Sequence, residues 1–107
     1  MIRTKEISGT HLQGNLTIPY NDLVRVFGKP HNLGDNYKTD VQWGFIEETD
    51  EFDNVTFTIY NWKNGPAYLG EGKVEEITDW NVGGHNTKAL AIVKSYLRHP
   101  FYRNYYG

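Results

Sequence analysis

Six consecutive residues in the last third of the chain have the types and spacing that suit binding of an anion. They are Gly83, Gly84, His85, Asn86, Thr87 and Lys88. Adjacent glycines let the backbone take conformations closed to other residues and let a ligand approach closely. A helix is expected directly after them, and its first turn offers unpaired N–H groups and a partial positive charge. Because a lysine and a histidine lie at the same end, the stretch predicts an anion pocket rather than a set of catalytic groups.

The glycine pair has a second interpretation, which the sequence leaves open. Gly-Gly before a helix also makes a tight connection from a strand, with Asn86 or Thr87 as the N-cap. The chain has neither the Gly-x-x-x-x-Gly-Lys-Ser/Thr pattern of a P-loop nor the Gly-x-Gly-x-x-Gly pattern of a dinucleotide site. The sequence therefore predicts an anion site that belongs to no standard nucleotide motif.

Aromatic side chains beside amides and lysines form the second part of the candidate site. Tyr60 and Trp62 lie at the end of a predicted strand, and Trp80 lies just before the glycine pair. Such rings stack on a base, and the neighbouring amides can bond to its edge. The alternative is that Tyr60 and Trp62 only cover the sheet. If a nucleotide binds, we expect its base to stack on one of these three rings.

The remaining polar residues form no recognisable catalytic or metal-binding pattern. The four histidines lack the spacing of a zinc site, the chain has no cysteine, and the Gly-x-Ser-x-Gly elbow of serine hydrolases is absent. The acidic run from Glu47 to Asp53 lacks the regularly spaced ligands of a calcium loop, so we expect a solvated hairpin tip. These patterns predict a protein that is not an enzyme and has no metal site or cofactor.

Composition limits the class of protein. The chain has 107 residues, 38% of them hydrophobic and 22% charged, which predicts one globular domain over residues 1–107. The net charge of −2 predicts no general attraction to nucleic acid or to anionic membranes. The chain has no signal-peptide core and no apolar run of roughly 20 residues, so we expect a cytoplasmic protein without a membrane span.

Hydrophobic periodicity predicts the elements that position the candidate site. Residues 40–47 and 54–62 alternate with period two and predict an antiparallel hairpin, whose inward side chains are Trp43, Phe45, Val55, Phe57 and Ile59. Helices are expected over 19–27 and 86–98, and a short strand over 79–82. Residues 8–14 are interpreted as a loop or bulged ribbon, and 67–78 as a flap or small ribbon. The pattern predicts an α+β fold: a small, curved antiparallel sheet with two helices packed on one face.

Two surfaces that are expected to expose aromatic side chains predict self-association. The second face of the sheet is expected to present Thr56, Thr58, Tyr60 and Trp62, and the tail over 98–107 is rich in aromatic residues. A small chain buries a limited core, so these surfaces predict a homodimer or higher oligomer.

Several stretches resemble small proteins encoded by tailed bacteriophages and prophages that have no assigned activity. The stretches are 8–14, 20–30, 38–40 with Trp43, 58–63 and 77–84. The resemblance implies a phage accessory protein that works by binding in the host bacterial cytoplasm, as a counter-defence factor.

Two binding classes follow, and the sequence does not decide between them. The anion-friendly helix start and the aromatic residues favour capture of a nucleotide second messenger. The acidic hairpin tip and the aromatic tail favour direct inhibition of a host defence protein, in the manner of anti-CRISPR proteins. A structural or virion-assembly role is the third possibility.

Overall fold

Five antiparallel strands form the sheet, and the computed structural model describes residues 1–31, 38–49 and 54–98. The spatial order of the strands is β1-β3-β4-β5-β2. The strands are β1 (Ile2–Arg3), β2 (His11–Thr17), β3 (Gln42–Glu48), β4 (Asn54–Tyr60) and β5 (Asp79–Gly84). The helices are α1 (Tyr20–Phe27), α2 (Pro66–Leu69), the 3-10 turn η1 (Val74–Glu76) and α3 (Lys88–Arg98). The predicted α+β class is confirmed.

The β3–β4 hairpin confirms the predicted register of hydrophobic residues. Trp43 lies opposite Ile59, and Phe45 lies opposite Phe57. All five side chains predicted to face inward are buried, because period-two alternation places them on the same face. The expectation of a solvated tip over 47–53 is wrong for Glu47, which belongs to β3 and is partly buried because it bonds to Tyr96. Residues 50–53 and the tail over 99–107 lie outside the described residues.

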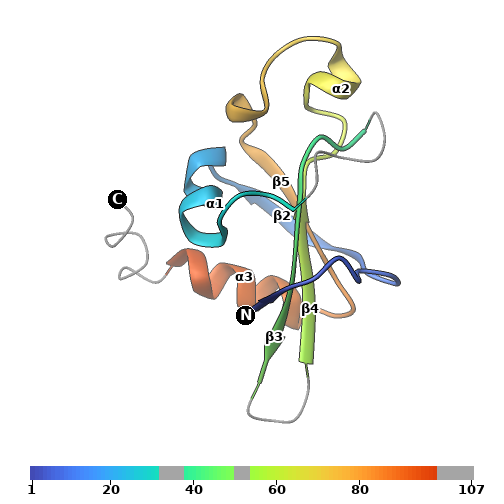
Figure 1. Cartoon of the computed structure of the whole chain (residues 1–107), viewed down its shortest axis with the longest axis vertical. Helices are drawn as coiled ribbons and strands as arrows, with labels where there is room; N and C mark the ends of the chain where they lie inside the picture. The colour runs from blue at the N-terminus through green and yellow to red at the C-terminus, as the bar shows by residue number, and fades with distance from the viewer. Residues whose placement is uncertain (32–37, 50–53, 99–107) are drawn as a thin grey trace.

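Helices α1 and α3 cover one face of the sheet, as Figure 1 shows. Leu23 and Phe27 of α1 and Ala89 and Val93 of α3 are buried there, which fits their helical spacing. Gly28, with φ of 81°, ends α1 because its backbone conformation suits glycine. Within residues 1–31, 38–49 and 54–98, no helix is long and apolar enough to cross a membrane.

Two buried tryptophans hold both ends of α1. The rings of Trp43 and Trp80 pack edge to face with centroids 5.6 Å apart. Trp43 Nε1 donates a hydrogen bond of 2.7 Å to the carbonyl of Gly28, and Trp80 Nε1 donates one of 3.0 Å to the carbonyl of Ile18. These carbonyls flank α1, so the pair fixes the helix on the sheet while satisfying both buried indole N–H groups.

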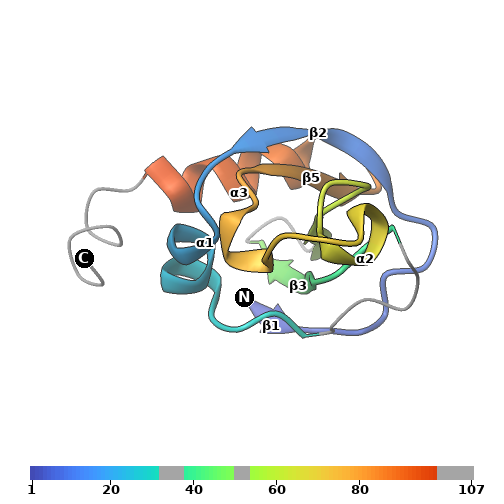
Figure 2. The same cartoon turned by 90° about the horizontal axis from the view of Figure 1, so that it is seen from above.

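The segment that joins β1 to β2 crosses the other face of the sheet. In Figures 1 and 2 this dark-blue segment runs on the side of the sheet away from α1 and α3. Thr4 N–H donates to the carbonyl of Gly44 at 3.0 Å, and a Cβ on Gly44 would lie 2.6 Å from the Thr4 carbonyl oxygen. The expectation that Thr58 is presented on an open face is wrong, because its side chain is buried and donates to the carbonyl of Trp43.

Two other segments differ from the sequence predictions. The predicted flap over 67–78 contains α2 and η1, whose single turns are too short to show helical periodicity. The predicted loop over 8–14 is largely strand β2, with a register shift between Leu12 and Gly14 that fits the bulged-ribbon alternative.

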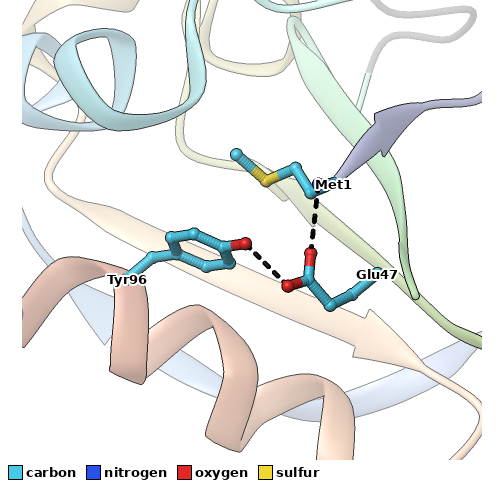
Figure 3. A network of polar contacts seen from close by, with 3 residues as sticks. All are labelled: Met1, Glu47 and Tyr96. Atoms are coloured by element: carbon cyan, nitrogen blue, oxygen red, sulfur yellow. Dashed lines mark hydrogen bonds and ion pairs between the residues drawn. The ribbon is translucent and has the colours of Figure 1, made fainter. Parts of the chain in front are cut away.

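A carboxylate links the N-terminus, the sheet and α3. Glu47 Oε1 accepts a hydrogen bond of 2.7 Å from the Tyr96 hydroxyl, and Glu47 Oε2 lies 3.4 Å from the N-terminal ammonium of Met1 (Figure 3). Glu47 points toward the helix face, so these contacts fasten the second half of α3 to β3.

A buried amide organises the opposite end of the sheet. Asn61 is fully buried, and its Oδ1 accepts from the backbone N–H groups of Asp40 and Val41 at 2.8 and 3.0 Å. Its Nδ2 donates to Asp40 Oδ2 at 2.8 Å, while Asp40 Oδ1 accepts from Ala67 N–H at the start of α2. One side chain thus joins the segments before β3 and after β4, and its carboxylate partner anchors α2.

Replacing Asn61 with alanine should cost about 3 kcal/mol of unfolding free energy, because two backbone donors and a buried carboxylate lose a partner. Urea unfolding followed by circular dichroism measures this. Asn15→Ala is the matched control, since it removes an exposed Asn15–Asn81 bond of 2.6 Å. Equal losses in the two variants would contradict the structural role of Asn61.

Candidate functional site

The glycine pair lies inside a strand and not in an open turn. Gly84 lies opposite Phe57 of β4 and His11 of β2, and Gly83 lies opposite Thr58 and Leu12. Both glycines are buried, and neither has a positive φ. The expectation that they free the backbone for a ligand is therefore corrected, because β5 is paired on both sides at these positions.

Close packing explains both glycines. A Cβ on Gly84 would lie 2.3 Å from the Ala89 Cβ, and a Cβ on Gly83 would lie 2.7 Å from the Thr58 Cγ2. Real Cβ atoms do not approach other atoms so closely, so Gly84 lets α3 rest directly on the sheet. Gly83 makes room on the opposite face for Thr58 and for the Tyr60 ring, whose Cε1 would be 3.5 Å away.

The four residues after the glycines do come together at the start of α3. His85, Asn86 and Lys88 line a shallow pocket of about 260 Å³ with residues 54–56 of β4. Thr87 is exposed beside them. Asn86 Oδ1 accepts the Lys88 backbone N–H at 2.9 Å, which makes Asn86 the capping residue, one of the two alternatives from the sequence. One of the helix-start donors is therefore already used within the chain.

Trp80 offers no surface to a ligand. It is 1% exposed, and its ring packs against Trp43 and, at 6.1 Å, Tyr20. The expectation that a base stacks on Trp80 is corrected, because the ring belongs to the core and its N–H is bonded to Ile18.

Trp62 and Tyr60 form an accessible aromatic surface at the end of β4. Trp62 is 45% exposed, and the half-buried Tyr60 meets it edge to face with centroids 6.4 Å apart. The Lys38 ammonium lies 5.5 Å from the centre of the Trp62 ring, a cation–π distance. We call Lys38, Tyr60 and Trp62 the Trp62 platform.

The turn that carries the platform is rigidly held. Asn61, between Tyr60 and Trp62, is the buried amide described above, and Lys63 N–H donates to the Lys38 carbonyl at 2.8 Å. Lys63 has φ of 60°, a left-handed conformation unusual for lysine. Such a conformation persists only when its surroundings fix it, so Trp62 is displayed by an ordered turn.

A second cation–ring pair, absent from the predicted site, lies next along the chain. The Lys63 ammonium is 5.8 Å from the centre of the Tyr68 ring, and Tyr68 is 44% exposed. Lys63 directly follows Trp62 in the sequence, but its partner lies on α2, which the sequence did not predict.

The predicted residues form two sites and not one. The pocket beside Lys88 borders Thr56, whereas the Trp62 platform begins at Tyr60. Tyr60 lies four positions after Thr56 along β4, about 13 Å at the usual rise per residue. The platform and the α3 pocket therefore cannot hold the base and phosphate of one compact mononucleotide.

The half-buried imidazole of His31 has a pKa below its usual value. Burial lowers its pKa, and Arg3 and Lys5 lower it further by charge repulsion. Both ring nitrogens are buried and find no hydrogen-bond partner among the described residues, and the ring meets Phe45 edge to face. Burial, with a smaller effect of Glu75, raises the pKa of the Tyr20 hydroxyl, which stays protonated in the core.

Among the described residues, no group of three or more His, Cys, Asp or Glu side chains could hold a metal ion. The comparisons add no family to this picture: the chain matches no protein-family model, no curated protein and no solved structure.

Gly84→Ala should destabilise the protein by roughly 1–3 kcal/mol, the usual cost of overpacking a core. Because the added methyl meets the Ala89 Cβ, Ala89→Gly should relieve the strain. We expect the double variant to be at least about 0.5 kcal/mol more stable than the sum of the single effects predicts. Chemical denaturation of all four proteins measures this coupling, and strictly additive losses would argue against the contact.

Stability should fall as the pH drops below about 6.5, where the unfolded His31 takes up a proton before the folded one does. This contribution is complete above that pH and is lost as the pH falls through the lower folded pKa. Unfolding free energies measured between about pH 8 and pH 5 test it. His31→Leu should flatten the profile and the control His11→Gln should not; equal slopes for His31→Leu and wild type would contradict the assignment.

Proposed function

We propose that this protein is a non-catalytic binding protein that captures a nucleotide-type anionic ligand on the Trp62 platform. The observation that carries the proposal is the exposed Trp62 ring with the Lys38 ammonium 5.5 Å from its centre. The proposal requires no cofactor, because stacking and charge supply the binding energy.

The chemistry of the platform suits a base joined to a phosphate. Any of the bases can stack on an indole ring, and each stacked base contributes roughly 1–3 kcal/mol of binding free energy. The edge-on Tyr60 ring borders the stacking position, and Lys38 supplies positive charge for the phosphate. The net charge of −2 favours such a local site over general binding to nucleic acid.

The pocket beside Lys88 is assigned a secondary role. Its distance from the platform means that a mononucleotide bound at Trp62 makes no contact with Lys88. Only a ligand of several nucleotide units, such as a cyclic oligonucleotide messenger, is long enough to reach both. A loss of affinity when Lys88 is replaced would therefore indicate a ligand of several nucleotide units.

The resemblance to small phage and prophage proteins supports a biological setting for this chemistry. We propose that the protein acts in the host bacterial cytoplasm as a counter-defence factor that removes a nucleotide second messenger. The proposal includes a homodimer or higher oligomer formed through the aromatic tail or the second face of the sheet.

Inhibition of a host defence protein is the second candidate. Trp62, Tyr68 and Leu69 are 45%, 44% and 57% exposed, and all three lie in the segment between β4 and η1. Exposed aromatic residues on an ordered turn are also common anchors of protein interfaces.

Calorimetric titration with a panel of linear and cyclic nucleotides tests the first candidate. Trp62→Ala should lower the affinity by roughly 5- to 150-fold, because a stacked base is worth roughly 1–3 kcal/mol. Lys88→Ala is the control and should leave mononucleotide binding unchanged. If no nucleotide gives measurable heat with the wild-type protein, capture of a nucleotide is excluded and inhibition of a protein becomes the working hypothesis.

A further inference from the structure

Strand β2 is an open edge of the sheet. It is the last strand in the spatial order, and β5 is its hydrogen-bonding neighbour within the described residues. Figure 2 shows β2 along the outer margin of the molecule, beside β5 and above α3. An edge strand presents a row of backbone N–H and C=O groups on its outer side, which can pair with another extended chain.

The bulge limits the usable length of this edge. The register shift lies between Leu12 and Gly14, and pairing is regular from Gly14 to Thr17. Pro19 follows shortly after and has no N–H to donate. The edge therefore accommodates a short extended segment of about four residues and resists open-ended sheet growth.

A groove runs between this edge and the C-terminal half of α3. Its volume is about 280 Å³, and it is lined by Leu16, Thr17, Ile18, Lys94, Leu97 and Arg98. We call these six residues the edge groove. The leucines and the isoleucine make its floor apolar, while Lys94 and Arg98 are exposed at its rim. An extended segment paired with β2 would direct alternate side chains toward this floor.

Both cations of the rim are available for a partner. The ion pairs between described residues join Met1 to Glu47 and Arg25 to Asp22, so no carboxylate there neutralises Lys94 or Arg98. Apolar residues flanked by two cations favour an apolar segment that also carries acidic side chains.

We propose that the edge groove binds an extended acidic–hydrophobic segment of a partner protein, which adds as a strand to β2. The main chain of the segment pairs with the outer edge of β2, and its alternate apolar side chains enter the groove over Leu16, Ile18 and Leu97. Carboxylates at other positions on this same face of the segment pair with Lys94 and Arg98, because the intervening side chains point away from α3. This surface is separate from the Trp62 platform, and the inference does not rest on the proposed nucleotide ligand.

Charge favours such a partner over a second copy of the chain. Two copies that pair β2 with β2 about a two-fold axis form one continuous sheet, with both α3 helices on the same face. Lys94 and Arg98 of the two copies would then approach one another across the axis. Four cations at one interface repel, whereas an acidic segment is attracted.

Fluorescence anisotropy with a labelled seven-residue peptide tests the proposal. The probe carries valine or leucine together with aspartate or glutamate at its odd-numbered positions, which face the groove, and threonine at its even-numbered positions. A matched peptide carries asparagine and glutamine in place of the acids. We expect the acidic probe to bind about tenfold more tightly than the neutral one, with an affinity that falls as salt is added. Equal binding of the two peptides, or no binding of either, overturns the proposal.

Two matched charge-reversal variants identify the surface at which the acidic probe binds. Lys94→Glu with Arg98→Glu should abolish binding of the acidic probe, whereas Lys5→Glu with Lys29→Glu has the same net charge change and should retain it. All four side chains are exposed, and circular dichroism checks the fold of both variants. Retained binding in the first variant overturns the assignment.

Two further measurements separate strand addition and self-association from other modes. Probe peptides N-methylated on alternate residues lose the donors of one edge, so methylation of one set should abolish binding and methylation of the other should not. Insensitivity to both sets excludes pairing with β2.

Light scattering tests self-association. If it finds a dimer that the probe dissociates, the occupant of the edge groove is a second copy of the chain, and the proposal of an acidic partner is overturned. Trp62→Ala should leave probe binding intact, which separates this result from that of the nucleotide titration.

Discussion

The contact between Trp43 and Trp80 is the interaction on which the rest of the structure depends. The two rings fill the space between the sheet and α1, and their N–H groups bond to the carbonyls of Ile18 and Gly28 at either end of that helix. Trp43 comes from β3 and Trp80 from β5, with β4 between them in the sheet. A single pair of side chains therefore fixes the spacing of three strands and the position of α1. This role also explains why Trp80 cannot take part in ligand binding.

Much of the fold follows from local pattern. Alternation predicts β3 and β4 with the correct inward residues, and helical spacing predicts α1, ended by Gly28, and α3. These elements bury one face, so their periodicity is visible in the chain. The short helix α2 could not be predicted, because its start is anchored by Asp40, which is itself held by Asn61, 21 positions away. The turn η1 is too short to show helical periodicity.

The candidate site was harder to predict because the same residue types serve packing and binding. Gly84 permits contact with Ala89, and only the distance between their Cβ positions reveals this. Trp80 and Trp62 look alike in sequence, yet one is buried and the other is displayed on a turn. Their difference depends on which side of the sheet each faces, and the cation beside Trp62 comes from a segment before β3. The alternative that Asn86 caps the helix was correct, since that motif is local.

The placement of the first two strands has a consequence for the order of folding. β1 and β2 lie at opposite edges of the sheet although they are neighbours in the sequence, and Asn15 pairs with Asn81, 66 positions later. Strand β2 therefore cannot pair with its neighbour until β5 has been synthesised. Closing such a long loop is entropically costly and slows folding relative to a sheet of consecutive hairpins. The β3–β4 hairpin is thus the natural nucleus, and β2 is added last, after β5 has paired with β4.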